Sequence, residues 1–284
     1  MLQRIVVGTG IVIIVVIAIF LSTSPAFMPI FGLLFSLMSA LILREFYRLA
    51  KFKGHEPLTL LGMATGFAYT LAVFTSTQAE LYQLLPYTIV MMSLFFGFCL
   101  FMIKGKDPLV NLSVTFFGLL YLAIPLSCVL LIIYFFPPDA AGDGRWWLAY
   151  TVAVSKMSDT GAYFGGRLLG KRPLASYISP KKTIEGSIAG FLFAVLTSIA
   201  LPFIASGISG GHPLNLTLSA SLFLGMAVAL LSQLGDLAES LLKRDAKVKD
   251  SSQLPGLGGM LDMIDSLVFT LPLVYGYLRI ITGV

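Results

Sequence analysis

Two pairs of acidic residues lie in the apolar C-terminal part of this chain, where a charge inside a membrane is costly. Asp236 and Glu239 are three residues apart, and so are Asp262 and Asp265. Residues three apart share one face of a helix, so each pair predicts two neighbouring carboxylates. Like charges held close together favour a cation between them, and ligands that are all oxygen suit a hard ion such as Mg²⁺.

Two basic clusters flank these acids. Residues 179–186 read SPKKTIEG, and residues 243–250 read KRDAKVKD. Basic loops beside acidic pairs would hold phosphates against a metal ion. That arrangement is typical of phosphoryl or nucleotidyl transfer, in which catalysis is mostly positioning and charge neutralisation. The same lysines also fit the ordinary excess of basic residues in the cytoplasmic loops of membrane proteins.

Lys156 and Asp159 are a third pair at the same spacing, and two interpretations stay open. They could neutralise each other, or they could belong to the site. Nearby, residues 165–172 read GGRLLGKR and match the Gly-x₄-Gly-Lys of a phosphate-binding loop. Arg172 stands where that loop needs Ser or Thr, and no strand is expected before it. We therefore expect these glycines to allow close helix packing instead.

The elements that carry these residues are expected to be membrane helices. The 284 residues are 57% hydrophobic and 12% charged, with a mean hydropathy of +0.91, whereas a soluble domain has about 25% charged residues. An all-α polytopic membrane protein with about nine transmembrane helices is predicted. The expected spans are residues 5–21, 27–43, 58–75, 84–103, 109–136, 146–166, 184–206, 214–235 and 259–281.

The distribution of basic residues predicts the orientation. With the N-terminus in the cytoplasm, sixteen of the nineteen Lys and Arg residues fall on the cytoplasmic side. The net charge of +5 is therefore explained without a nucleic-acid partner. The first apolar run is expected to be an uncleaved helix of a multi-pass protein in the cytoplasmic membrane.

The chain is expected to divide into two functional parts. Residues 1–107 would be a scaffold, because the only acids in the first hundred residues, Glu45, Glu56 and Glu80, are all expected in loops. Residues 108–284 would form the catalytic region, with a site facing the cytoplasm. The fifth span, which is unusually long, could be one tilted helix or could include a piece that does not cross the membrane.

Four stretches resemble one enzyme family. Residues 240–266, SLLKRDAKVKDSSQLPGLGGMLDMIDS, resemble the signature of phosphatidate cytidylyltransferases, also called CDP-diacylglycerol synthases. QLGDLAES at 233–240, SDTGAYFGGRLLGKR at 158–172 and SPKKTIEG at 179–186 are similar to further family motifs, and their order is the family's. The resemblance covers roughly residues 146–284. It implies transfer of the cytidylyl group of CTP to phosphatidic acid, with Mg²⁺ as cofactor and pyrophosphate as the second product.

The resemblance also implies roles for individual residues. Asp236, Asp262 and Asp265 would hold the metal, and together with Lys249 they are the expected catalytic residues. The expected substrate-binding residues are Ser179, Lys181, Lys182, Glu185, Lys243, Arg244, Asp159, Gly258 and Gly259. Two positions depart from the family pattern, because Leu257 replaces a histidine and Met263 replaces an arginine.

Two other functions compete with this one. A CTP-dependent lipid or polyprenol kinase would use the same metal chemistry but would transfer the γ-phosphate. An ion-coupled transporter would also bury acids in broken helices. The expected partners are CTP, phosphatidic acid and the lipid bilayer, with a homodimer as the candidate assembly.

Overall fold

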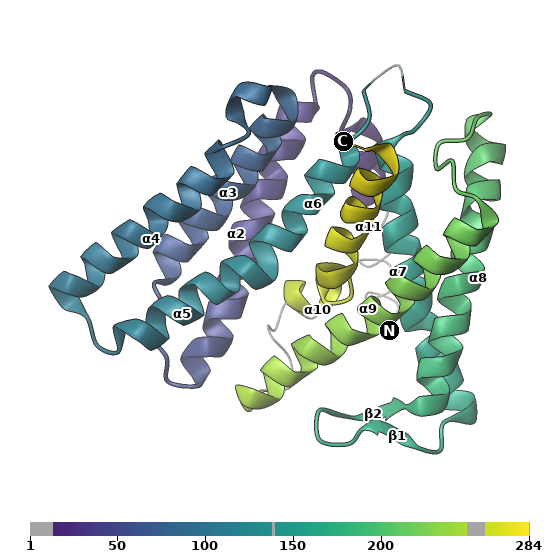
Figure 1. Cartoon of the computed structure of the whole chain (residues 1–284). Helices are drawn as coiled ribbons and strands as arrows, with labels where there is room; N and C mark the ends of the chain where they lie inside the picture. The colour runs from purple at the N-terminus through teal and green to yellow at the C-terminus, as the bar shows by residue number, and fades with distance from the viewer. Residues whose placement is uncertain (1–13, 138–139, 249–258, 284) are drawn as a thin grey trace. The chain divides into compact units, whose positions relative to one another are not determined.

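The computed structural model describes residues 14–137, 140–248 and 259–283, and almost all of its regular structure is helical (Figure 1). The chain forms two compact units. The first unit comprises Met1–Leu131 and Leu242–Met263, and the second comprises Ile132–Leu241 and Ile264–Val284. Each unit therefore combines segments that lie far apart in the sequence, and the two acids of the C-terminal pair belong to different units.

The first unit is built on long apolar helices in which α2 packs against α3 and α3 against α4. Its elements are α2 (Met28–Phe52), α3 (Thr59–Gln78), the 3₁₀ turn η1 (Glu80–Tyr82), α4 (Leu85–Lys104), α5 (Pro108–Gly118), η2 (Leu119–Ala123) and all but the last two residues of α6 (Ile124–Ile133). Tyr47 is fully buried in this core, and its hydroxyl donates to the carbonyl oxygen of Thr115 at 2.7 Å. A buried hydroxyl needs such a partner in an apolar interior.

The long fifth segment is a single helical run that contains a change of pitch. A π-helical turn, η2, joins α5 to α6 without a break in the helix. The run ends at Ile133, close to the predicted end at residue 136. The π-helical turn inserts extra backbone into an otherwise α-helical segment, a feature that is often found near functional sites.

The second unit is centred on a tight pair of helices, α7 (Gly144–Leu169) and α8 (Ile184–Ser209). A Cβ atom added at Gly165 would lie 2.3 Å from the Cβ of Ala189, and one at Gly186 would lie 2.7 Å from the carbonyl oxygen of Ala162. The prediction that these glycines allow close helix packing is confirmed. The unit also holds most of α9 (Leu218–Asp245) and all of α11 (Leu267–Thr282), whereas α10 (Met260–Ile264) crosses the boundary between the units.

A small hairpin between α7 and α8 is the one departure from an all-α fold among the described residues. Strands β1 (Pro173–Ala175) and β2 (Ser179–Thr183) pair in antiparallel fashion, with Pro173 opposite Thr183 and Ala175 opposite Ser179. The basic SPKKTIEG stretch was expected to be a loop, but its first five residues are strand β2. The hairpin lets a charged segment between α7 and α8 satisfy part of its own backbone hydrogen bonding.

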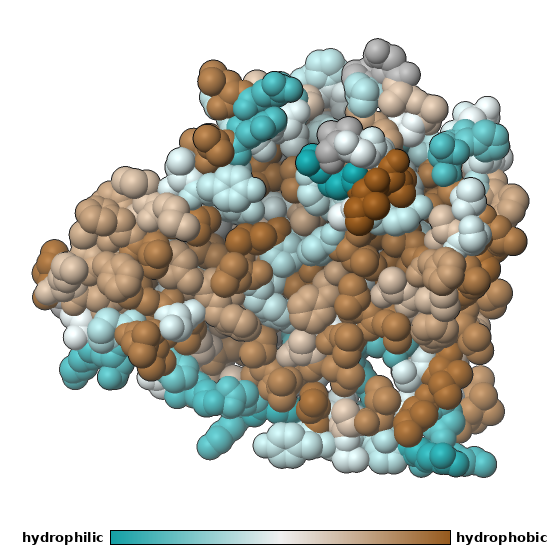
Figure 2. Space-filling model, in the orientation of Figure 1, coloured by the Kyte–Doolittle hydropathy of each residue, from teal (hydrophilic) through white to brown (hydrophobic). Residues whose placement is uncertain are grey.

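The helices fit a multi-pass membrane protein. Seven helices among the described residues are long and apolar enough to cross a membrane. The prediction of about nine spans is not confirmed, because α7 is not among the seven and the first predicted span lies partly outside the described residues. Large apolar side chains such as Leu33, Phe95 and Leu196 are about half exposed or more, and Figure 2 shows hydrophobic residues over most of one face. Such surfaces suit contact with lipid.

Candidate active site

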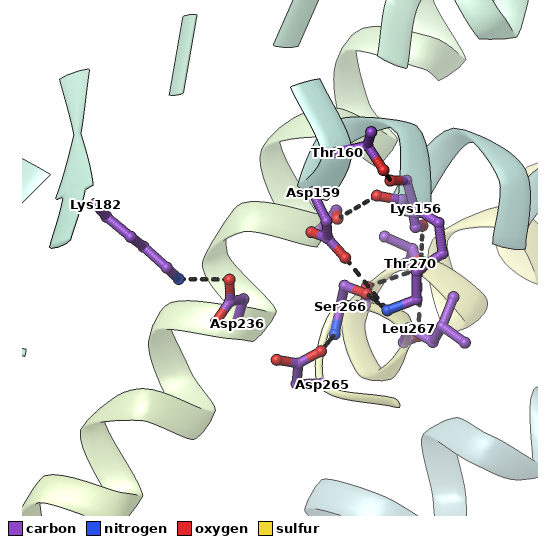
Figure 3. A network of polar contacts seen from close by, with 11 residues as sticks. Lys156, Asp159, Thr160, Lys182, Asp236, Asp265, Ser266, Leu267 and Thr270 are labelled. Carbon is purple, nitrogen blue, oxygen red and sulfur yellow. Dashed lines mark hydrogen bonds and ion pairs between the residues drawn. The ribbon is translucent and has the colours of Figure 1, made fainter. Parts of the chain in front are cut away.

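An ion pair joins the hairpin to α9 in the second unit. Lys182 lies on β2, and its Nζ is 2.6 Å from Oδ2 of Asp236 on α9 (Figure 3). Both side chains are partly exposed, at 26% and 32%. A residue predicted to bind substrate phosphate therefore contacts a residue predicted to bind a metal. A partly exposed pair of this kind adds little to the stability of the fold.

Asp265 lies next to Asp236 because a glycine lets two segments of backbone touch. A Cβ atom at Gly235 would lie only 2.3 Å from the carbonyl oxygen of Asp265. Asp265 is 8% exposed, and the next residue, Ser266, accepts a hydrogen bond from Nζ of Lys156 at 2.9 Å. Figure 3 shows the Asp236 and Asp265 side chains on these neighbouring segments. Two of the three predicted metal ligands are thus brought together.

The helix that was expected to carry both C-terminal acids is interrupted. Asp262 lies in α10, but α10 ends at Ile264, and Asp265 and Ser266 form a turn before α11 begins. The prediction that Asp262 and Asp265 share one continuous helix face is therefore wrong. The physical reason is local, because Oδ1 of Asp265 accepts the backbone N–H of Ser266 at 2.6 Å. Such a side-chain acceptor competes with helical hydrogen bonding.

Lys156 and Asp159 form an ion pair, as one of the two interpretations predicted. Nζ of Lys156 is 3.2 Å from Oδ2 of Asp159, and it also donates to the Ser266 hydroxyl at 2.9 Å. Lys156 therefore connects α7 to the turn that carries Asp265 (Figure 3). The two interpretations are compatible, since the pair is internal to α7 and still lies beside a candidate metal ligand.

A further lysine–aspartate pair, between Lys243 and Asp262, lies in the first unit. Nζ of Lys243 is 2.5 Å from Oδ1 of Asp262, and the backbone N–H of Gly259 donates to Oδ2 of Asp262 at 3.0 Å. The lysine and aspartate side chains are 15% and 26% exposed. Both carboxylate oxygens of Asp262 are thus engaged, one by a cation and one by the backbone at the start of α10.

The remaining predicted residues have different surroundings. Glu185 accepts the backbone N–H groups of Lys171 at 3.0 Å and Arg172 at 3.2 Å, so it holds the chain between α7 and β1. Ser179 and Lys181 lie on β2, and Arg244 is exposed at the end of α9. Lys249 and Gly258, together with the departure at Leu257, lie outside the described residues, whereas Met263 is described and is 40% exposed.

Two further acidic residues, Glu239 and Glu45, are buried within helices. Glu239 is fully buried on α9, one turn after Asp236, as the spacing predicted. Glu45 was expected in a loop, and this prediction is wrong, because α2 continues to Phe52 and Glu45 is 6% exposed inside it. An acid just beyond an apolar run, followed directly by the aromatic residues Phe46 and Tyr47, was the available signal that the helix continues and buries this side chain.

The carboxylates suit a magnesium ion that is bound together with its substrate. Among residues 14–137, 140–248 and 259–283, no three His, Cys, Asp or Glu side chains form a metal cluster by themselves. Mg²⁺ in proteins usually takes one or two carboxylates and completes its shell with water and substrate phosphates. Asp236 and Asp265 offer oxygen donors of this kind, so the side chains present fit the ion.

These features define a class, namely a polytopic membrane protein with lysine–aspartate pairs in its C-terminal half. The model of the Cytidylyltransferase family matches residues 2–281, and the chain belongs to this family. It is therefore a nucleotidyltransferase.

Curated relatives agree with this assignment. The chain is 31% identical to the phosphatidate cytidylyltransferase of Chlamydia pneumoniae over 98% of its own length and 92% of that protein's. It is 42% identical to the phosphatidate cytidylyltransferase of Staphylococcus haemolyticus over 46% of the chain and 48% of that protein. The enzyme of the same name from Haemophilus influenzae is 40% identical over 59% of the chain and 57% of that protein.

Proposed function

We propose that this enzyme transfers the cytidylyl group of CTP to phosphatidic acid, giving CDP-diacylglycerol and pyrophosphate. A phosphate oxygen of the lipid attacks the α-phosphorus of CTP, a new P–O bond forms, and the bond to the β-phosphate breaks. The names of the relatives support this choice of acceptor. The kinase and transporter alternatives have no comparable support.

The observation that carries the proposal is the repeated pairing of a candidate phosphate-binding lysine with a candidate metal-binding aspartate. Lys182 pairs with Asp236, and Lys243 pairs with Asp262. When the substrate binds, each lysine would turn from its aspartate to a nucleotide phosphate, and the aspartate would be released to bind metal. The lysines would then stabilise the negative charge that builds up on the phosphates. In such an exchange, each lysine and each aspartate would pass from one partner of opposite charge to another.

Magnesium, held by Asp236, Asp262 and Asp265, would neutralise phosphate charge and polarise the reacting phosphate. Lys249 and Arg244 would add positive charge around the nucleotide. Ser179, Lys181 and Asp159 would line the substrate cleft, with Gly258 and Gly259 allowing close backbone approach. Glu185 would support that cleft by holding the backbone at Lys171 and Arg172.

The site would face the cytoplasm, with the N-terminus on the same side, because the lysine-rich segments then obey the positive-inside rule. CTP is a cytosolic solute and the acceptor is a membrane lipid, so the reaction needs an interface of this kind. Nine spans, including the first helix and α7, would satisfy this arrangement. Residues 1–107 would act as scaffold for a catalytic region at 108–284, and a homodimer is the candidate assembly.

The proposal is tested with Asp236→Asn and Asp262→Asn in protein purified in detergent with CTP, phosphatidic acid and Mg²⁺. Each substitution removes a charge while keeping the side chain's size, and each should lower turnover about 100-fold or more. Asp107→Asn is the matched control, because Asp107 is exposed in a turn before α5. Near-normal turnover in both site variants would overturn the proposed metal site.

A further inference from the structure

Glu45 is a buried acid in the half of the chain that was expected to be only a scaffold. It lies in α2, a helix of mostly apolar residues, and is 6% exposed. Burying a carboxylate is costly unless its oxygens find donors. Here Oε2 accepts the backbone N–H of Met260 at 2.9 Å, and Oε1 accepts that of Leu261 at 3.4 Å.

The two N–H groups that Glu45 binds are at the first turn of α10. The first N–H groups of any helix have no partner inside that helix, so an outside acceptor stabilises its start. An acceptor usually comes from a neighbouring residue, but Glu45 and Met260 are 215 residues apart. Glu45 thus fixes where α10 begins.

The segment that Glu45 holds is the one that carries Asp262. Leu261, whose side chain is fully buried, is the residue directly before Asp262. Oδ2 of Asp262 accepts the N–H of Gly259, and Oδ1 contacts Lys243. The backbone donors of three consecutive residues, 259 to 261, are therefore taken by two carboxylates. One of these carboxylates is the candidate metal ligand, and the other holds the backbone beneath it.

We propose that Glu45 is a positioning residue of the enzyme, which fixes the backbone at Met260 and Leu261 and so orients the Asp262 carboxylate toward metal and nucleotide. The proposal rests on the proposed function, in which Asp262 binds metal. Glu45 itself is not a ligand in this account, because its oxygens face N–H donors. Residues that orient a metal ligand typically change metal affinity or activity by about 10–100-fold when they are replaced.

The first test needs neither metal nor substrate. Hydrogen exchange measured by mass spectrometry on the full chain should show faster exchange, on the order of tenfold, in peptides covering residues 259–263 of Glu45→Ala. Glu45→Gln keeps one carbonyl oxygen as an acceptor, so its exchange should be intermediate. Glu80→Ala removes an exposed carboxylate of the same unit and should leave this region unchanged. Wild-type exchange in both Glu45 variants would overturn the proposal.

The second test separates positioning from simple stability. The Mg²⁺ concentration for half-maximal activity should rise about tenfold in Glu45→Ala and less in Glu45→Gln, while Glu80→Ala keeps the wild-type value. If Glu45→Ala does not fold, the Glu45→Gln variant decides alone. Faster exchange at 259–263 with an unchanged Mg²⁺ dependence would reduce Glu45 to a structural residue and overturn the proposal. A wild-type protein without cytidylyl transfer would instead contradict the proposed function, and the exchange result would still stand.

Discussion

The close approach of Gly235 to Asp265 makes a sharp test of how the second unit builds its candidate site. In Gly235→Ala, the new Cβ would lie 2.3 Å from the carbonyl oxygen of Asp265 and 3.4 Å from the Cα of Ser266. The obstructing atoms belong to the backbone, so no change of side-chain rotamer can relieve the clash. Either α9 or the turn at Asp265 must move.

The size of the effect follows from that distance. Carbon and oxygen need a separation of more than about 3 Å, so the turn must shift by something approaching 1 Å. Overpacking of this kind costs about 1–3 kcal/mol of stability. A misplacement of about 1 Å at a reacting site costs about 100-fold in rate. Asp236 follows Gly235 directly, so the shift changes the separation of two candidate ligands.

The assay is the rate of CDP-diacylglycerol formation together with thermal unfolding in detergent. Gly235→Ala should lose about 100-fold in rate while unfolding at a modestly lower temperature. Gly276→Ala is the matched control, because it lies in α11 and a Cβ there meets no atom within 4 Å. Alanine is also the better helix former, so the control should be at least as stable as the wild type. A wild-type rate in Gly235→Ala would refute the close packing of α9 against the turn.

Three further results are expected. Gly186→Ala should destabilise the α7–α8 pair by about 1–3 kcal/mol in thermal unfolding, because its Cβ would lie 2.7 Å from the Ala162 carbonyl oxygen. Gly207→Ala is the control and should cause no such loss of stability, because a Cβ at Gly207 meets no atom within 4 Å. Lys182→Met should raise the KM for CTP about tenfold or more, because a phosphate-binding charge is lost. An unchanged KM would show that Lys182 on β2 takes no part in nucleotide binding. Lys53→Ala breaks an ion pair with Asp245 in which both side chains are about half exposed, so the free energy of unfolding should change by less than about 1 kcal/mol. A larger loss would show that this pair stabilises the fold.

The local features of the site could be predicted from the sequence because they depend on spacing along one helix. Lys156 and Asp159 are three residues apart and do form a pair, and Asp236 and Glu239 do lie on one helix. The glycines that allow α7 and α8 to approach were also visible as small residues in apolar runs. In each case the helix geometry alone decides the outcome.

The features that were missed depend on partners far away in the sequence or on short irregular segments. Glu45 contacts Met260 across 215 residues, and no local pattern reports such a contact. The hairpin at residues 173–183 is too short and too charged to show a strand period. The turn at Asp265 follows from one side-chain hydrogen bond, which interrupts a run that is apolar enough to suggest a continuous helix.

The most direct test of the central claim follows the phosphorus atoms of CTP. Purified protein with Mg²⁺ and phosphatidic acid is given CTP labelled at the α-phosphorus in one reaction and at the γ-phosphorus in another. The account predicts that α-label enters the lipid fraction as CDP-diacylglycerol and that γ-label leaves as pyrophosphate. Lipid that carries the γ-label, with CDP as the second product, would contradict cytidylyl transfer and show a kinase instead.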